Sequence, residues 1–367
     1  MMFLNLPLAF RRLGIGASSR WKNCLLSVRQ FQRLLSRERA RSDRSGDRFS
    51  LLVLVPSTSP KGTAFYSQLA RSLHKRVRST DESGWLDSER VAVVLPGTSP
   101  RGAWKLADDV CKNWSGNPRP ICQVYCYPSD TTQLDQSIVD RRAKKGENDE
   151  TSTLPDKNGK ALEPLFMKGM PLWKRAIDVT AAGIGLTMLF PLFAVVAAAI
   201  KCTSRGPVFF TQMRSGCGGR PFLMYKFRTM VSDAEKRKAA LMALNEQDGP
   251  AFKLTNDPRV TRVGQFLRAT SIDELPQLWN VLRGEMSLVG PRPLPCNESD
   301  ACLDWQRRRL DVTPGLTCIW QVRGRSTVNF NEWVRMDLEY VSRRTLWHDT
   351  KILLATVPAV IQRRGAK

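Results

Sequence analysis

Two neighbouring carboxylates, Asp273 and Glu274, stand in the segment SIDELPQLWN (271–280) of a strongly basic chain. Acidic residues suit a helix N-terminus, because they complement the positive end of the helix dipole. A carboxylate pair can also act as a nucleophile and as a ligand of a divalent cation. Pro276 fits only in the first turn of a helix, so we expect a helix to begin near Asp273, although Ser271 also has the spacing of a capping box. In either case the helix dipole would keep both carboxylates ionised at neutral pH.

Three basic side chains are placed to contact an anion. The segment 206–230 predicts a β-hairpin with its turn at Gly216 to Gly219. Lys226 and Arg228 are two residues apart in the second strand, so they project to the same face and could hold a phosphate together. A solvated edge strand is the alternative for this segment. Arg292 lies between two prolines and would be a stiffly mounted anion contact.

The bulk composition agrees with anionic partners. The 367 residues contain 57 Lys plus Arg against 34 Asp plus Glu, a formal net charge of +23. Such a chain is long enough for two domains, and its charge favours nucleic acid, acidic lipid headgroups or phosphorylated substrates as partners. The nine cysteines contain no CxxC pair, and there are only two histidines. We therefore expect reduced thiols in a cytosolic protein, with neither a zinc site nor a His-based triad.

Residues 1–48 form a basic segment with eleven basic and three acidic side chains. No apolar core of signal-peptide length follows the first arginines, so a secretory signal does not fit. We expect a flexible, solvated N-terminal tail. Loose contact with an anionic membrane surface is the functional alternative.

Residues 49–130 alternate strand patterns with helix patterns. SLLVLV (50–55), VAVVLP (91–96) and ICQVYCY (121–127) are typical of strands, and apolar residues at helical spacing follow the first two. This order predicts a ferredoxin-like βαββαβ domain, so the expected fold class is α+β. Residues 131–165 are polar, charged and poor in large apolar side chains, which predicts a disordered linker.

An apolar stretch raises the question of a membrane. Val179 to Ile200 contains no ionisable side chain, and at about 1.5 Å per residue it would reach about 33 Å, enough to cross a bilayer core. Pro191 interrupts the stretch and would bend or break a helix. Basic residues flank both ends, and positive charge favours the cytosolic side. We therefore expect a re-entrant helix–break–helix over 176–201, with a simple crossing or a buried soluble helix as alternatives. The flanking basic residues are Lys174, Arg175, Lys201 and Arg205.

Four motifs in the second half of the chain together resemble one family. They are YKFRTM (225–230), SIDELPQLWNVLRGEMSLVGPRP (271–293), TPGLTCIWQVRGR (313–325) and MDLEYV (336–341). From KRAIDVTAAGIGL onward the chain is similar to the bacterial sugar transferases, the monotopic polyprenyl-phosphate phosphoglycosyl transferases. The resemblance implies a mixed α/β catalytic domain over 166–367 that holds the membrane through the re-entrant segment.

The resemblance also implies a reaction. Such enzymes move a sugar phosphate from a nucleotide-diphosphate sugar, here expected to be a UDP-sugar, to polyprenyl (undecaprenyl) phosphate. Asp273 would attack the sugar-proximal phosphate and form a phospho-sugar aspartyl intermediate, while Glu274 would hold Mg²⁺. Lys226, Arg268 and Arg292 match positions of the phosphate site. The implied place of action is the cytosolic face of the bacterial inner membrane, in exopolysaccharide or O-antigen assembly.

Three further residues carry weaker implications of the same resemblance. Arg325 and Asp337 are expected in substrate binding or in structural support, and Pro191 matches the helix-break proline of the family. Phe190 precedes it where Ser is common, so the break itself is an expectation that the structure must test. A second copy of the chain is a further candidate partner, as a homodimer.

The N-terminal domain resembles a second family. SGWLDSERVAVVLPGTSPRGAWKLADDV (83–110) is similar to a diguanylate-cyclase-type (GGDEF) domain. It departs from that family in two places: SGWLD stands at the glycine-and-acid turn, and VPSTSP (55–60) lacks the metal-binding aspartate. The resemblance therefore implies a non-catalytic regulatory or assembly module.

Two alternatives to an enzyme come from different classes of function. A nucleic-acid binding module has the charge in its favour, but the sequence carries no binding motif and no interleaved aromatic and basic residues. It also leaves the apolar stretch unexplained, so nucleic acid is not expected as a partner. A catalytically inactive membrane scaffold is the other alternative, and the presence of both Asp273 and Glu274 argues against it.

Overall fold

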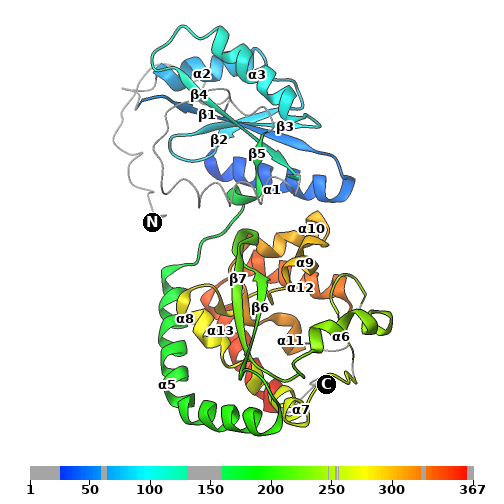
Figure 1. Cartoon of the computed structure of the whole chain (residues 1–367). Helices are drawn as coiled ribbons and strands as arrows, with labels where there is room; N and C mark the ends of the chain where they lie inside the picture. Colours follow the sequence, from blue (N-terminus) through cyan, green and yellow to red (C-terminus); the bar gives the residue numbers. More distant parts are fainter. Residues whose placement is uncertain are drawn as a thin grey trace, which may run out of the picture. The chain divides into compact units, whose positions relative to one another are not determined.

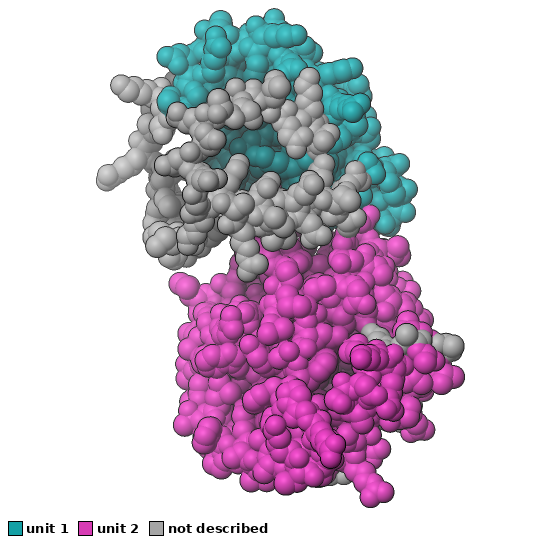
Figure 2. Space-filling model, viewed as in Figure 1, with its two compact units in different colours: residues 1–162 teal, residues 163–367 magenta. Residues whose placement is uncertain are grey.

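The chain divides into two compact units, residues 1–162 and residues 163–367 (Figure 2). Both combine helices with β-structure, which confirms the α+β class. This computed structural model describes residues 25–58, 64–129, 159–246, 248–252, 254, 256–323 and 328–361. The first part of the basic tail, most of the expected linker and Arg325 lie outside the described residues.

The N-terminal unit is built on one five-stranded sheet. Its elements are α1 (Val28–Ser45), β1 (Phe49–Pro56), α2 (Ala64–His74), β2 (Glu82–Trp85), β3 (Val91–Pro96), α3 (Pro100–Lys112), β4 (Pro120–Tyr127) and β5 (Lys160–Ala161). The strand order is β2-β3-β1-β4-β5, and all neighbours from β2 to β4 are antiparallel. From β1 to β4 the elements follow the β–α–β–β–α–β order along the chain. The strands predicted from SLLVLV, VAVVLP and ICQVYCY are thus all present.

Helices cover both faces of this sheet. Figure 1 shows α2 and α3 on one side and α1 on the other. On the first side, Leu52 and Leu54 of β1 pack with buried residues of α2 and α3. Strand β1 is buried on both faces, because its residues alternate between the two helix layers. A sheet covered on both faces gives this unit a core of its own.

Helix α1 corrects the expectation of a flexible tail over residues 1–48. The basic segment from Val28 to Ser45 is helical and begins at a capping box between Ser27 and Gln30. Its buried residues include Phe31 and Leu35, which are 0% and 4% exposed. The segment contains enough apolar residues at helical spacing to bury one face of a helix. Its high net charge favoured the prediction of a solvated tail instead. The end of the expected linker is also structured, because β5 pairs in parallel with β4.

The second unit surrounds a β-hairpin with helices. Its strands are β6 (Phe209–Ser215), β7 (Pro221–Phe227), β8 (Ser287–Val289) and β9 (Gly315–Thr317). Its α-helices are α5 (Leu172–Thr203), α6 (Ala234–Leu241), α7 (Arg262–Ala269), α8 (Gln277–Arg283), α9 (Cys296–Asp300), α10 (Asp304–Arg307), α11 (Ile319–Arg323), α12 (Phe330–Arg343) and α13 (Leu346–Ile361). Its 3₁₀-helices are η3 (Glu163–Leu165), η4 (Cys217–Gly219), η5 (Met242–Leu244), η6 (Ile272–Glu274) and η7 (Arg308–Asp311). The hairpin predicted over 206–230, with its turn at η4, is confirmed.

Helix α5 contains the apolar stretch and turns a corner partway along (Figure 1). Pro191 lies inside it, where a missing N–H and a steric clash disturb the helical ladder. Within the described ranges, α5 is the one helix long and apolar enough to cross a membrane. Met188 and Phe190 are 74% and 71% exposed. The middle of α5 therefore presents apolar side chains away from its own unit.

Both ends of α5 are attached to the second unit. Near its start, Asp178 accepts a hydrogen bond from the Leu288 backbone N–H at 3.0 Å, and Arg175 donates to two carbonyl oxygens at the end of α8, each at 2.7 Å. Near its end, Ile200 is buried against Phe227 and Leu267. Lys174 and Arg175, identified from the sequence as basic residues that flank the apolar stretch, thus make their contacts inside the fold.

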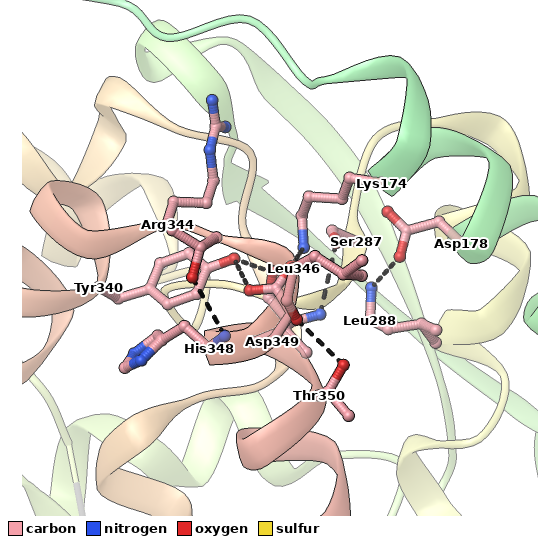
Figure 3. A network of polar contacts seen from close by, with 12 residues as sticks. Lys174, Asp178, Ser287, Leu288, Tyr340, Arg344, Leu346, His348, Asp349 and Thr350 are labelled. Atoms are coloured by element: carbon pink, nitrogen blue, oxygen red, sulfur yellow. Dashed lines mark hydrogen bonds and ion pairs between the residues drawn. The ribbon is translucent and has the colours of Figure 1, made fainter.

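A buried ion pair completes the attachment at the start of α5. Figure 3 shows Lys174 and Tyr340 meeting at Asp349 of α13. The Lys174 Nζ lies 2.5 Å from Asp349 Oδ2, and the Tyr340 hydroxyl lies 2.9 Å from Asp349 Oδ1. The side chains of Lys174 and Asp349 are only 4% and 6% exposed. A buried charge left without its partner is strongly destabilising, so this pair holds α5 against α13.

Replacing Lys174 by Met should therefore lower the free energy of unfolding of this unit by about 3 to 5 kcal/mol, because the Asp349 carboxylate stays buried without its cation. Thermal denaturation of the detergent-solubilised chain measures the loss. The matched control is Arg283→Met, whose pair with Glu285 spans 3.1 Å but leaves the arginine side chain 50% exposed. The control should cost less than about 1 kcal/mol. Equal losses in the two variants would contradict the assignment.

Candidate active site

The two carboxylates lie in a 3₁₀ turn rather than at an α-helix start. Ile272 to Glu274 form η6, and α8 begins only at Gln277, after Pro276. Ser271 adopts a left-handed backbone with φ of 57° and makes no side-chain cap, so the capping box is not formed. A non-glycine residue rarely adopts this conformation, and such strain is typical of functional sites. Asp273 and Glu274 therefore precede the first turn of α8 instead of forming it.

Two cations hold Glu274. The Lys226 Nζ donates to Glu274 Oε1 at 2.8 Å, and the Arg292 guanidinium donates to both carboxylate oxygens, to Oε2 at 3.1 Å. Burial alone would raise the pKa of Glu274, but Arg292 and Lys226 outweigh it and hold this pKa well below its usual range. Lys226 comes from β7 and Arg292 from the loop after β8, so the tertiary fold assembles the cluster. The structure thus brings Lys226 and Arg292 together at one carboxylate, and their predicted role in binding phosphate stays a prediction.

Asp273 differs from its neighbour in having no direct partner. The side chain is buried, yet no hydrogen bond or ion pair to its carboxylate occurs within the described part of the chain. Burial raises the pKa of Asp273 to about 6, and the cations Lys226, Arg268 and Arg292 oppose that rise. At neutral pH the group is mostly ionised. A charged carboxylate without a hydrogen-bond partner, surrounded by cations, is well suited to attack an electrophile.

Both carboxylates line a cavity of about 610 Å³. Arg268 enters it from α7, with its Nε donating to the Thr229 hydroxyl at 3.0 Å. Helix α7 approaches closely here, because a Cβ at Gly264 would lie 2.0 Å from the Thr229 carbonyl oxygen. Only glycine permits that approach, and the approach places Arg268 beside the acidic pair. The cavity therefore combines one free carboxylate with three nearby cations, which suits a ligand that carries phosphate.

Two other predicted site residues, Arg228 and Asp337, serve the fold. Arg228 lines the cavity, but its guanidinium donates to the carbonyl and hydroxyl oxygens of Ser204 at the end of α5, both at 2.8 Å. Asp337 is not at the cavity: it lies 2.7 Å from Arg309, and both side chains are buried. Arg309 in turn donates to the Arg292 carbonyl at 2.5 Å. Asp337 therefore holds Arg309, and Arg309 contacts the backbone of Arg292. Of the two roles expected for Asp337, this contact is structural support and not substrate binding.

Sequence reasoning missed Arg214 and Gln212 of β6. The Arg214 guanidinium donates to the Pro293 carbonyl at 2.8 Å and to the Gln212 side chain at 2.7 Å, and both residues line the cavity. Burial, together with nearby Arg292, lowers the pKa of Arg214 to about 10. The predicted hairpin could have identified both residues, because Gln212 and Arg214 are two apart in the strand and lie on the same face of the hairpin as Lys226. Arg309 carried no such signal, since it follows no recognised pattern.

The donor groups at the cavity can also be tested for a divalent cation. Mg²⁺ in phosphate-handling sites is held by one or two carboxylates, together with substrate phosphates and water. Asp273 and Glu274 provide two neighbouring carboxylates, and Glu274 keeps an acceptor position on Oε2, which takes only one hydrogen bond. No group of three or more Asp, Glu, His or Cys side chains that could hold an ion occurs in the part of the chain described. The site therefore fits an ion that shares its ligands with a bound phosphate.

Comparison with known proteins relates this site to one family. Residues 170–363 match the bacterial sugar transferase family. The galactosyl transferase CpsE of Streptococcus agalactiae is 44% identical over 195 residues, which are 53% of this chain and 43% of CpsE. The UDP-glucose:undecaprenyl-phosphate glucose-1-phosphate transferase of Caulobacter vibrioides is 43% identical over 54% of this chain and 73% of its own length. The chain thus spans less than half the length of CpsE.

Solved structures of low sequence identity also match part of the chain. A diguanylate cyclase (DGC) protein from Thermotoga maritima covers 32% of this chain and 94% of its own length, with 18% identity and a TM-score of 0.26. A likeness at this level assigns no function to the N-terminal unit. The expected GGDEF-type relationship stays a prediction.

Removing the carboxylate of Asp337 should destabilise the support of Arg292. Asp337→Asn leaves the Arg309 guanidinium buried without its counter-charge, and we expect a loss of about 3 to 5 kcal/mol in the free energy of unfolding. Glu339→Gln is the matched control, since Glu339 lies on the same helix and also pairs with arginines, but is 30% exposed. It should cost less than about 1 kcal/mol. Urea denaturation followed by tryptophan fluorescence compares the two, and a harmless Asp337→Asn would refute the supporting role.

Proposed function

Because the chain belongs to the bacterial sugar transferase family, we propose that it transfers a sugar 1-phosphate from a nucleotide-diphosphate sugar to polyprenyl phosphate. The products are a polyprenyl-diphosphate sugar and a nucleoside monophosphate. The observation that carries this proposal is the unpartnered Asp273 carboxylate in a cavity lined by Lys226, Arg268 and Arg292. The relative from Caulobacter is named for UDP-glucose and undecaprenyl phosphate, which supports a UDP-sugar and that lipid as the substrates to test first.

Asp273 is the nucleophile of the proposed reaction. One Asp273 carboxylate oxygen attacks the sugar-proximal phosphorus, the bond to the bridging oxygen breaks, and the nucleoside monophosphate leaves with that electron pair. The sugar phosphate is then bound to Asp273 as an acyl phosphate. An oxygen of the lipid phosphate next attacks the same phosphorus and releases the Asp273 carboxylate. Two steps at one site avoid bringing both anionic substrates together at once.

The cations explain why anionic groups can approach a carboxylate here. Lys226 and Arg292 are oriented by Glu274, and Arg268 is oriented by Thr229, so all are placed before the substrate arrives. Preorganised charges stabilise a phosphoryl-transfer transition state without the cost of reorientation. A Mg²⁺ ion bound with Glu274 would neutralise charge on the diphosphate.

We propose that α5 enters the membrane from the cytosolic face and returns to it. The observations that support this are the attachment of both helix ends to one unit and the exposed apolar residues between them, including Met188, Phe190 and Val195. A straight crossing would place the two ends on opposite sides of the bilayer. Helix α5 turns a corner, which allows the return (Figure 1), and it contains Pro191, a residue that bends helices. The enzyme would thus act at the cytosolic face of the inner membrane.

The N-terminal unit is proposed to be a ferredoxin-like module without catalysis of its own. Its strand order, β2-β3-β1-β4 with antiparallel neighbours, supports this assignment. The sequence VPSTSP at the end of β1 contains no carboxylate that could bind a metal there. A regulatory or assembly role fits a unit with its own core.

The covalent mechanism predicts a burst of nucleotide release. With a UDP-sugar and Mg²⁺ but no lipid, the wild-type chain should release close to one UMP per chain and gain the mass of a sugar phosphate. Asp273→Asn should lose the burst and lower turnover with lipid by at least about 10³-fold. Glu274→Gln should also lower turnover, because Lys226 and Arg292 lose their common partner.

Glu339→Gln serves as the control that keeps the burst, since Glu339 lies outside the cavity. A direct transfer from nucleotide sugar to lipid would instead release UMP only after lipid is added. A chain that releases UMP from no UDP-sugar under any of these conditions would favour the inactive scaffold.

The re-entrant topology makes a prediction that the native cysteines can test. Cys111 in α3 and Cys202 near the end of α5 are both exposed. If α5 returns to the cytosolic face, a membrane-impermeant maleimide should label neither in intact spheroplasts and both in inverted membrane vesicles. Peptide mass spectrometry reads each cysteine separately. Labelling of one of the two in spheroplasts would show a crossing helix instead.

A further inference from the structure

A line of arginines occupies the outer face of α1. At about 100° per residue, the side of α1 opposite the buried Phe31 and Leu35 carries an arginine at nearly every turn. All these arginines are exposed, and from first to last they extend over about 22 Å at about 1.5 Å per residue. We call them the arginine stripe, and its members are Arg29, Arg33, Arg37, Arg41 and Arg44.

The charge of the stripe is almost uncompensated. Helix α1 contains two carboxylates, Glu38 and Asp43. Asp43 accepts a hydrogen bond from the Tyr127 hydroxyl at 2.6 Å, on the sheet side of the helix, and Glu38 approaches only Arg41, at 3.8 Å. Among the residues that the structure describes, no carboxylate pairs with the other four members of the stripe. Arg39, by contrast, is buried over the Tyr127 ring, so the fold separates one buried, structural arginine from the five exposed arginines of the stripe.

We propose that the arginine stripe binds the anionic lipid headgroups of the membrane in which α5 is embedded. The proposal goes beyond the transferase reaction and uses only the membrane attachment from the proposed function. Guanidinium groups pair with phosphate oxygens through two parallel hydrogen bonds, and basic residues near an anionic bilayer are attracted to its surface. A straight helix that exposes five guanidiniums along one line presents them together to a flat surface.

The observations favour lipid over nucleic acid as the anion. Single-stranded nucleic acids are bound by aromatic side chains interleaved with basic ones, and the exposed face of α1 contains no aromatic residue. The same chain carries α5, which is long and apolar enough to enter a bilayer. An N-terminal unit joined covalently to α5 therefore meets headgroup phosphates at high effective concentration.

Arginine-selective labelling of the full chain tests the proposal. The chain is reconstituted in nanodiscs of phosphatidylcholine alone and in nanodiscs with about one third phosphatidylglycerol. Phenylglyoxal modification rates of individual arginines are then measured by peptide mass spectrometry. We expect the rates at Arg33 and Arg37 to fall by at least about threefold in the anionic discs, and to recover when salt is raised to about 0.5 M. Arg71 of α2 and Arg101 of α3 are exposed internal controls and should react equally in both.

Charge-reversal variants identify the stripe as the cause. In Arg33→Glu/Arg37→Glu/Arg44→Glu the remaining Arg29 should lose its protection by anionic lipid. In a matched triple reversal on the opposite helix layer, Arg71→Glu/Arg101→Glu/Lys105→Glu, Arg29 should keep it. Both variants should retain UMP release, because none of these residues lies at the cavity. A variant that fails to fold does not affect the test, since the native chain already provides the comparison between lipids.

Each alternative outcome overturns the proposal in a different way. Equal rates in neutral and anionic discs, as fast as those of the controls Arg71 and Arg101, would show that the stripe does not contact lipid. Rates at the stripe that are slower than those of the controls in both kinds of disc would place a protein surface on the stripe. Protection that appears only when a DNA or RNA oligonucleotide is added would make nucleic acid the partner. Lipid protection and UMP release are measured separately, so loss of either one leaves the other conclusion standing.

Discussion

The arrangement of the site depends on the charge balance around Glu274. Lys226 and Arg292 are both partly buried, and both bond to this carboxylate, so Glu274 provides the counter-charge for two cations of the site. Asp273 consequently remains free of a direct partner while it experiences the field of the same cations. Two adjacent carboxylates thus acquire opposite electrostatic characters, one with a lowered pKa and one with a raised pKa. Divergent environments of this kind are the usual basis for giving two acids different roles.

The fold supplies this balance from several directions. The hairpin β6–β7 brings Lys226, the loop after β8 brings Arg292, and α7 brings Arg268. Behind Arg292, the buried pair of Arg309 and Asp337 holds the backbone in place through the Arg292 carbonyl. Buried ion pairs contribute little net stability compared with apolar packing, but breaking one is costly. They therefore suit positions whose geometry has to be maintained.

The same principle operates where α5 joins the second unit. Lys174 and Asp349 form a buried pair, Asp178 accepts from a strand backbone, and Arg175 satisfies carbonyl groups at the end of α8 (Figure 3). These groups attach an apolar helix to the rest of the second unit through directional polar contacts. At the other end, Arg228 holds the helix terminus at Ser204. Arg228, which was predicted to bind phosphate, thus connects the cavity wall to the end of α5.

Local pattern in the sequence was sufficient for most of the elements and for several of the residues that line the cavity. Short apolar runs identified the strands of the first unit, a glycine-containing turn identified the hairpin, and a long stretch without ionisable residues identified α5. The motif around Asp273 and Glu274 identified the pair. The net charge led to one wrong prediction, a flexible tail, because α1 buries a narrow apolar face and exposes basic residues on the opposite face. What only the tertiary structure decided is which cation serves which partner. In sequence, four of these cations are simply basic residues: Lys174, Arg228, Arg292 and Arg309. Their roles differ because each is placed beside a different carbonyl or carboxylate group that is distant along the chain.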